Sequence, residues 1–163
     1  MNTAALITDI KSGIHFNQLV LIGVDGRSGA GKSTLAGELA AQLPNATLVH
    51  LDDYNLYAGE ESIKKVVNEV ILPLKKLKPK KVVILEGIFA LNKTLINFYD
   101  YKIWIDILPE IGFQRGLARD MSMNGINNAD KWLNYWLPKE DEYISVEQPQ
   151  HLADFTINAT MPL

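Results

Sequence analysis

The sequence predicts an α/β protein: a three-layer α/β/α sandwich built on a mostly parallel, five-stranded sheet. Two patterns favour this fold class. Short runs of β-branched and aliphatic residues alternate with segments whose apolar residues recur at helical spacing. The run 82–85 is hydrophobic throughout, as is typical of a strand covered on both faces. Because strands alternate with helices, we expect right-handed crossovers between parallel strands.

The first half of the chain supplies two strands and three helical patterns. A short amphipathic helix ends near Ile14 and is expected to pack on the edge of the sheet. A strand at 19–24 leads through a glycine-rich turn into a helix, and a second strand follows at 46–51. The next amphipathic helix, 61–72, is expected to end or kink at Pro73.

The second half begins with a lysine-rich segment at 75–81. Its charges favour a solvated helix end and linker over a patch that binds polyphosphate or nucleic acid. Strands are expected at 82–85 and 101–105. A helix beginning at Pro109 should present Phe113, Leu117 and Met121 as one apolar stripe. The remaining elements predicted are a mobile loop at 121–128, a helix over 129–148 interrupted at Pro138, and a strand at 154–158.

Composition limits the classes of function. The 163 residues are predicted to form one domain, 1–163, with a lid segment at about 112–128. The net charge of −3 provides no overall basic surface, so neither nucleic acid nor a membrane is expected as a partner. There is no cysteine, which excludes disulfides, thiolate metal sites and cysteine nucleophiles. With no signal-peptide pattern near the N-terminus, these features favour a cytoplasmic protein, and a monomer and a homo-oligomer both remain open.

The turn after the first strand carries the most specific motif. Residues 26–33 match G-x-x-x-x-G-K-[ST], the phosphate-binding loop of the P-loop NTPase fold, between a strand and a helix as its chemistry requires. Its amide groups can surround phosphate oxygens at the positive end of the helix, Lys32 can reach the β- and γ-phosphates, and Ser33 can hold Mg²⁺. A plain glycine-rich turn would have no use for this lysine. The residues predicted to bind the nucleotide are Gly26, Arg27, Ser28, Gly29, Ala30, Gly31, Lys32, Ser33 and Thr34.

Acidic residues end several predicted strands, at the edge where open α/β sheets bind ligands. Asp25, Asp52, Glu86 and Asp106 are therefore expected to converge on one crevice, and His50 is the histidine expected to face it. Glu86 matches the acid that positions the Mg²⁺ shell in phosphate-loop enzymes, with a helix-capping acid as the alternative. Asp52 and the next residue offer a general base and a second acidic contact; an Asx-type turn is the alternative.

Asp53 and Tyr54 are predicted to contact the acceptor substrate. Farther along, Arg115 and Arg119 share the helix face opposite the apolar stripe. Like charges four residues apart repel unless an anion lies between them, so we predict that both arginines serve the transferring phosphoryl group from a movable lid. An exposed pair partly offset by Asp120 is the alternative. For the tryptophans at 132 and 136, packing is favoured over base stacking.

Several strings resemble the uridine kinase-like branch of the phosphate-loop kinases, which includes nicotinamide riboside kinases and phosphoribulokinases. They are Gly-Val-Asp-Gly-Arg-Ser-Gly-Ala-Gly-Lys-Ser-Thr-Leu-Ala at 23–36, Leu-Asp-Asp-Tyr at 51–54, Val-Val-Ile-Leu-Glu-Gly at 82–87, Ile-Trp-Ile-Asp at 103–106 and Arg119-Asp120. Later residues resemble small bacterial members: Trp132, Trp136, Glu142, Tyr143 and Ala153-Asp154. The resemblance implies that Asp52 is the catalytic base and that Arg115 and Arg119 are lid arginines.

Together these features predict an ATP- and Mg²⁺-dependent kinase that phosphorylates a hydroxyl of a small metabolite, with nucleosides first among acceptors. Family members with nucleoside acceptors carry a long insertion between the second and third strands, which this chain replaces with 54–81. Nicotinamide riboside, pantothenate, a sugar phosphate and GTP in place of ATP therefore remain open. The rival function is a nucleotide-dependent switch or regulatory ATPase, although no guanine-reading Asn-Lys-x-Asp is present, because Asn92-Lys93 is followed by Thr94-Leu95.

Overall fold

The computed structural model describes residues 3–14 and 17–160. Its strands all pair in parallel in the order β2-β3-β1-β4-β5. They are β1 (Val20–Gly26), β2 (Ala46–His50), β3 (Val82–Glu86), β4 (Tyr101–Asp106) and β5 (Phe155–Asn158). Strand β1 lies at the centre, between β3 and β4, so the glycine-rich turn leaves the middle of the sheet. The predicted α/β/α fold with a parallel five-stranded sheet is confirmed.

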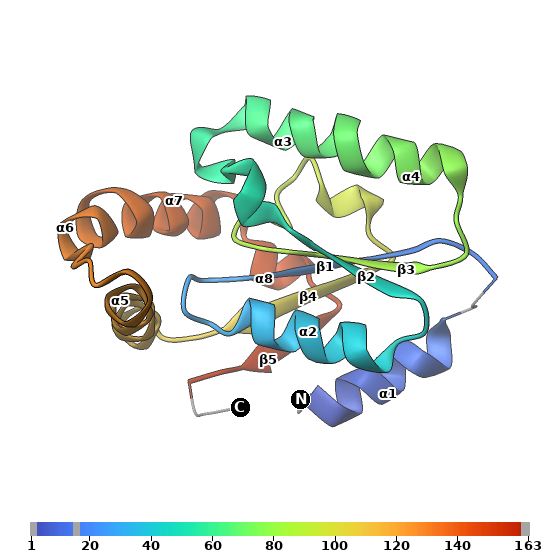
Figure 1. Cartoon of the computed structure of the whole chain (residues 1–163), viewed down its shortest axis with the longest axis horizontal. Coiled ribbons are helices and arrows are strands. Elements are labelled where there is room, and N and C mark those ends of the chain that lie inside the picture. Colours follow the sequence, from blue (N-terminus) through green and yellow to red (C-terminus); the bar gives the residue numbers. More distant parts are fainter. Residues whose placement is uncertain (1–2, 15–16, 161–163) are drawn as a thin grey trace.

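Helices cover both faces of this sheet and one end of its strands. They are α1 (Thr3–Gly13), α2 (Lys32–Gln42), α3 (Glu60–Val66), α4 (Leu72–Leu77), α5 (Pro109–Asn124), α6 (Ala129–Lys131), α7 (Leu137–Glu147) and α8 (Pro149–Leu152). Figure 1 shows α1 and α2 on one side of the sheet and α3 and α4 on the other. Helices α5, α6 and α7 lie near the end of the sheet where β1 leads into α2 (Figure 1). In the described ranges 3–14 and 17–160, no helix combines the length and apolar character needed to cross a bilayer.

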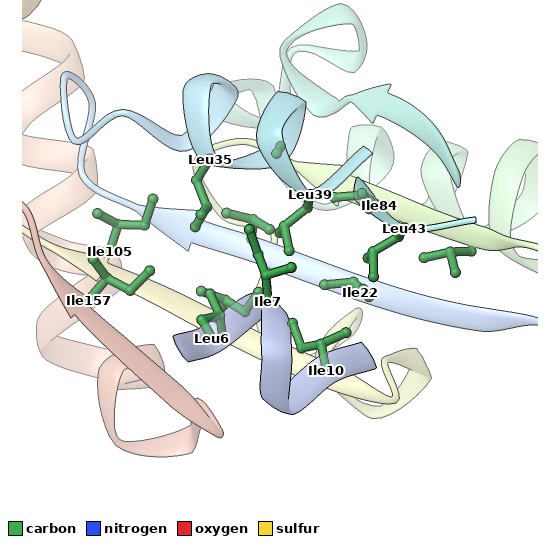
Figure 2. Close-up of a cluster of buried hydrophobic side chains, with 14 of the residues drawn as sticks. Leu6, Ile7, Ile10, Ile22, Leu35, Leu39, Leu43, Ile84, Ile105 and Ile157 are labelled. Atoms are coloured by element: carbon green, nitrogen blue, oxygen red, sulfur yellow. The ribbon is translucent and has the colours of Figure 1, made fainter. Parts of the chain in front are cut away.

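The first core lies between the sheet and helices α1 and α2. Figure 2 shows that side chains from both helices and from four strands share one apolar cluster. The labelled members are Leu6, Ile7, Ile10, Ile22, Leu35, Leu39, Leu43, Ile84, Ile105 and Ile157. Leu6 and Ile10 are fully buried, so α1 covers a face of the sheet beside α2 and does not lie at its edge as predicted. Burying its whole apolar side requires contact with both the sheet and α2.

The second core fills the opposite face. It joins β1, β3 and β4 to α3, the segment 88–99 and Tyr143 of α7 through residues such as Leu21, Leu85 and Trp104. The central strands are therefore covered on both sides, which explains the uninterrupted hydrophobicity of β3. Together the two cores hold rigid the strand ends that carry the predicted site.

Two prolines that were expected to interrupt helices are accommodated within them. The helix predicted to end or kink at Pro73 continues to Leu77, and the one containing Pro138 continues to Glu147. A π-helical turn directly precedes each proline-containing segment, at Val67–Ile71 and at Trp132–Trp136. Proline lacks the N–H that would bond to the carbonyl four residues back. In the π turns the N–H groups of Leu72 and Leu137 bond to the carbonyls five residues back, those of Val67 and Trp132. The hydrogen-bond spacing therefore changes immediately before each proline, and the helix continues through it.

Helix α5 is longer than predicted and buries a different face. It runs to Asn124, so the loop expected to begin at Met121 begins only at Gly125, which ends the helix with φ 64°. The expected apolar stripe is at most half-buried, and Met121 is 46% exposed. The buried positions are Gly112 and Gly116. Small residues there let the α5 backbone approach its neighbours closely.

Candidate active site

A cavity of about 460 Å³ lies where β1 leads into α2. Its size is in the range of small-molecule sites. Several predicted site residues line it together: Ser28, Gly29, Gly31, Lys32, Ser33, Thr34, Asp52, Glu86, Arg115 and Arg119. The structure thus brings together residues from the glycine-rich turn, from two strand ends and from α5, which lie far apart in the sequence.

The glycine-rich turn is held by close backbone packing. Gly29 has a φ of 78°, and a Cβ added there would lie 2.2 Å from the carbonyl oxygen of Gly112 in α5. Gly31 is also left-handed, at φ 91°, and immediately precedes α2 as its N-cap residue. Only glycine tolerates both this conformation and this contact. The amides that follow are therefore presented at the N-terminus of an 11-residue helix, where an anion is stabilised.

Lys32 folds back into the turn that precedes it. Its Nζ donates to the carbonyl oxygens of Gly26, at 2.9 Å, and Arg27, at 3.0 Å, and the residue is 9% exposed. An ammonium group has three N–H donors, so it can bind a further oxygen in the cavity that it lines. This geometry holds a positive charge at the base of the turn, as phosphate binding requires.

Ser33 and Glu86 both line the cavity and are hydrogen-bonded to each other. Ser33 Oγ donates to Glu86 Oε1 at 3.1 Å, and Nδ1 of His50 lies 2.5 Å from the same oxygen. Glu86 is only 2% exposed, whereas the His50 side chain is 49% exposed. We expected His50 to face the crevice. It contacts the Glu86 carboxylate, which lines the cavity, but His50 is not itself a lining residue.

This pair fits a Mg²⁺ ion that also binds phosphate. Hydroxyl and carboxylate oxygens are the ligands that Mg²⁺ takes in such sites, usually one or two of them together with water and substrate phosphates. Throughout the part of the chain that the structure describes, no group of three or more His, Cys, Asp or Glu side chains could hold a metal ion. Protein ligands alone would not complete a metal centre here, so water and phosphate oxygens would supply the remaining ligands.

Asp52 reaches the cavity from the end of β2. It lies in the 3₁₀ turn Leu51–Tyr54, it is exposed, and it lines the cavity. Gly87, with φ 156°, allows this turn to approach, since an added Cβ would lie 2.9 Å from Cβ of Leu51 and 3.5 Å from Asp52 Oδ1. An exposed carboxylate that lines the same cavity as the phosphate-binding turn can accept a proton from a hydroxyl bound there.

The two residues after Asp52 lie outside the cavity lining. Asp53 is exposed, and Tyr54 is half-buried with the Lys65 ammonium 5.9 Å from its ring centroid. Instead, Asn55 and Tyr57 from the same segment line the cavity. Acceptor contacts by Asp53 and Tyr54 stay predictions.

Both predicted arginines of α5 line the cavity. Arg115 is partly buried, and its guanidinium donates to the carbonyl oxygen of Ala159 at 3.0 Å. Arg119 is exposed and lies 3.3 Å from Asp120 Oδ1. Asp120 also accepts from Trp132 Nε1 at 2.9 Å, which ties α5 to the π turn after it. Burial raises the pKa of Asp120, but these hydrogen bonds and the Arg119 charge outweigh burial and lower the pKa overall.

Two of the strand-end acids do not join the crevice as predicted. Asp106 is exposed and lies outside the cavity lining. Asp25 is fully buried outside the cavity lining and accepts from Leu91 N at 2.8 Å, Tyr143 Oη at 2.7 Å and Gly26 N at 2.6 Å. Burial raises its pKa to about 6, against the lowering effect of these donors. Asp25 thus anchors the start of the turn and is inaccessible to a substrate.

Sequence reasoning missed the carboxylate that contacts the turn from α7. Glu140 is fully buried, and it accepts from Ser28 and from Tyr57. Nothing in the local sequence distinguishes it from its acidic neighbours. The tryptophans were assigned to packing, which fits Trp132 at 2% exposure, yet Trp132 and Trp136 both also line the cavity.

Comparison with known proteins adds the family. The model of the phosphoribulokinase / uridine kinase family matches residues 58–160, more than half of the chain. This chain belongs to that family. The resemblance inferred from the motifs is confirmed at this level.

Individual members of the phosphoribulokinase / uridine kinase family match only in part. A phosphoribulokinase from Synechocystis sp. is 26% identical over 180 residues, covering 88% of this chain and 54% of that protein. A uridine kinase from Staphylococcus aureus is 40% identical over 75 residues, which are 45% of this chain and 32% of that protein. The chain thus spans about half the length of the first relative and matches about a third of the second.

Solved structures support the fold. A possible uridine kinase from Bacillus stearothermophilus superposes with a TM-score of 0.71 at 18% identity, covering 95% of this chain and 96% of that one. A shikimate kinase from Bacteroides thetaiotaomicron gives a TM-score of 0.57 at 20% identity, with 88% of each chain covered. These likenesses place this family member among α/β kinase folds.

Proposed function

We propose that this chain is an ATP-dependent kinase that transfers the γ-phosphoryl group to a hydroxyl of a small metabolite, most readily a nucleoside. The observation that carries this proposal is that one cavity contains the lysine of the phosphate-binding turn, the Ser33–Glu86 pair, an accessible carboxylate and two arginines. Each of these groups answers one requirement of phosphoryl transfer. Family membership supports the same reaction class.

The proposed chemistry is a direct displacement. The acceptor oxygen forms a bond to the γ-phosphorus, the bond from that phosphorus to the β–γ bridging oxygen breaks, and ADP leaves. The hydroxyl proton passes late to Asp52, because the transition state is loose. Lys32, Arg115 and Arg119 stabilise negative charge on the phosphates. Mg²⁺, held by Ser33 with help from Glu86, would neutralise charge on the β- and γ-oxygens.

The apolar and aromatic lining of the cavity supports a ring-containing acceptor. Tyr57, Ile88 and Trp136 line the same cavity as Asp52, and the Tyr57 and Trp136 ring centroids are 6.5 Å apart. Aromatic and aliphatic surfaces of this kind pack against planar rings, while the Asn55 amide offers a hydrogen bond. A nucleoside meets both requirements. A sugar phosphate would leave the apolar wall unused.

The test is an ADP-release assay with MgATP and a panel of acceptors: nucleosides, nicotinamide riboside, pantothenate and sugar phosphates. We expect ADP release to rise with one acceptor class, and phosphorylated acceptor to form in equal amount. Lys32→Ala should abolish the signal. Asp106→Asn, which alters a strand-end acid outside the cavity, should retain it.

ADP release that no acceptor stimulates would overturn the kinase proposal and favour a regulatory ATPase. Stimulation by a sugar phosphate alone would keep the kinase and refute the nucleoside preference. Replacing ATP with GTP in the same assay establishes which nucleotide is used.

A further inference from the structure

Three consecutive residues of α7 contact the phosphate-binding turn and Tyr57. Lys139 Nζ donates to the carbonyl oxygen of Tyr57 at 2.7 Å. Glu140 contacts both Ser28 and Tyr57, while Asp141 Oδ1 lies 2.6 Å from a buried guanidinium nitrogen of Arg27. The first turn of α7 therefore connects the phosphate-binding turn to the 3₁₀ turn Leu56–Ala58.

Glu140 is the centre of this connection. Its Oε2 accepts from the Ser28 backbone N–H at 3.1 Å, and its Oε1 accepts from Ser28 Oγ at 2.5 Å and Tyr57 Oη at 2.6 Å. A fully buried carboxylate is costly unless such donors compensate it. Both partners line the cavity, whereas Glu140 does not. It can therefore influence a ligand only through them.

On the nucleotide side, Glu140 orients one peptide of the glycine-rich turn. The Ser28 N–H points toward the carboxylate, which limits how the peptide between Arg27 and Ser28 can rotate. Glycines make the rest of the turn conformationally permissive, so its shape depends on what holds it from outside. Gly112 of α5 packs against one part, and Glu140 of α7 holds the adjacent part.

On the acceptor side, the same carboxylate fixes an aromatic ring. Tyr57 Oη is held by Glu140, with Ser28 Oγ 3.2 Å away. The ring stands edge-on to Phe89, with centroids 5.0 Å apart, and it lines the cavity. If an acceptor displaced this ring, the hydrogen bond from Tyr57 to Glu140 would shift, and with it the bonds from Glu140 to Ser28.

We propose that Glu140 is a positioning residue that couples the acceptor wall to the phosphate-binding turn. This inference rests on the proposed kinase function. Without the carboxylate, the phosphate-binding turn loses its hydrogen bonds to α7, and the Tyr57 hydroxyl loses its acceptor. The affinities for nucleotide and for acceptor should therefore fall together. Loss of a hydrogen bond to a charged group of this kind corresponds to about a tenfold change in affinity.

The test measures MgATP binding by isothermal titration calorimetry to the full chain, with thermal unfolding as a check of folding. We compare Glu140→Gln, Tyr57→Phe and the double variant with the unmodified chain. Glu142→Gln is the matched control, because Glu142 is an exposed glutamate of the same helix. We expect Glu140→Gln to bind about tenfold more weakly and Glu142→Gln to match the unmodified chain.

The double variant should bind no more weakly than Glu140→Gln alone, because both changes break one connection. In the kinase assay, Glu140→Gln should raise KM for both substrates more than it lowers kcat. Unchanged MgATP affinity in Glu140→Gln, or fully multiplicative effects in the double variant, would overturn the coupling role. An unmodified chain that binds no MgATP refutes the proposed function itself. Should Glu140→Gln fail to fold, Tyr57→Phe decides: weaker MgATP binding supports the coupling, and unchanged MgATP binding refutes it.

Discussion

Ser33 Oγ donates to Glu86 Oε1 over 3.1 Å, which joins the first turn of α2 to the last residue of β3. This contact places the hydroxyl that we propose as a Mg²⁺ ligand directly beside a buried carboxylate. We predict that Glu86→Gln raises the Mg²⁺ concentration needed for half-maximal activity by about 10–100-fold, since groups that orient metal ligands have effects of this size. Titration of ADP release with MgCl₂ measures it. An unchanged Mg²⁺ dependence would remove Glu86 from the metal site.

Asp52 should matter for transfer and little for nucleotide binding. It lines the cavity outside the phosphate-binding turn and is exposed. Asp52→Asn keeps the size of the side chain but removes its ability to accept a proton, so we expect kcat to fall by at least about 100-fold. The Kd for MgATP should stay within about twofold, because no ion pair to the nucleotide is lost. Calorimetry and single-turnover assays check the two parts, and a fully active Asp52→Asn would eliminate the assigned base.

The two arginines of α5 should separate in their effects on stability. Removing either one lowers kcat, by about tenfold to a hundredfold, if both stabilise charge on the transferring group. Arg115→Ala also loses the hydrogen bond to the carbonyl oxygen of Ala159, which should cost about 1–2 kcal/mol of unfolding free energy. Arg119→Ala should leave the unfolding free energy almost unchanged, since its side chain is 56% exposed. Steady-state kinetics measures the fall in kcat, and urea unfolding measures the loss of stability. An equal loss of unfolding free energy in Arg115→Ala and Arg119→Ala would contradict the structural role given to Arg115.

The parallel-sheet geometry explains why much of the site could be predicted. Parallel strands bring their carboxyl ends to one edge, so the chain position of Asp52 and Glu86 was enough to place both beside the glycine-rich turn. The same reasoning failed for Asp25 and Asp106. Strand ends converge, but side chains alternate between faces, and only tertiary contacts decide which acid meets the cavity.

Glu140 could not be identified from sequence for a related reason. Acidic residues on helices are usually exposed. Its burial follows from the approach of α7 to Ser28 and Tyr57, and no local pattern encodes that approach. The helix pattern similarly pointed to an apolar stripe on α5, whereas the close contacts are made by Gly112 and Gly116.

Gly116 provides a test of that close packing. A Cβ added there would lie 2.3 Å from the Trp132 ring, so Gly116→Ala must displace α5 or the tryptophan. We expect a loss of about 1–3 kcal/mol in unfolding free energy and a raised KM for ATP. Gly37→Ala is the matched control, because Gly37 lies within α2 with nothing within 4 Å of an added Cβ. That variant should gain about 0.5–1 kcal/mol. Equal changes in unfolding free energy for the two substitutions would show that the packing of α5 does not depend on the close contact with Trp132.

Asp25 gives the fold a pH dependence of defined sign. Burial raises its pKa from 3.8 to about 6 in the folded state, so between these values the folded chain binds more protons than the unfolded chain. Its contribution to stability is therefore fully present below about pH 4 and is lost as pH rises through about 6. Relative to Asp25→Asn, the unfolding free energy of the unmodified chain should fall by up to about 3 kcal/mol over this range.

Urea unfolding of both proteins between pH 4 and pH 8 measures that difference. Tyr143→Phe sharpens the test, because the Tyr143 hydroxyl donates to Asp25 Oδ2 at 2.7 Å and lowers the pKa of Asp25. Without this donor the pKa should rise further, and the loss of stability should move to higher pH. If the unfolding free energy of the unmodified chain instead rises with pH relative to that of Asp25→Asn, the three donors outweigh burial and lower the pKa of Asp25. Asp25 would then be a carboxylate that stabilises the start of the phosphate-binding turn through its charge.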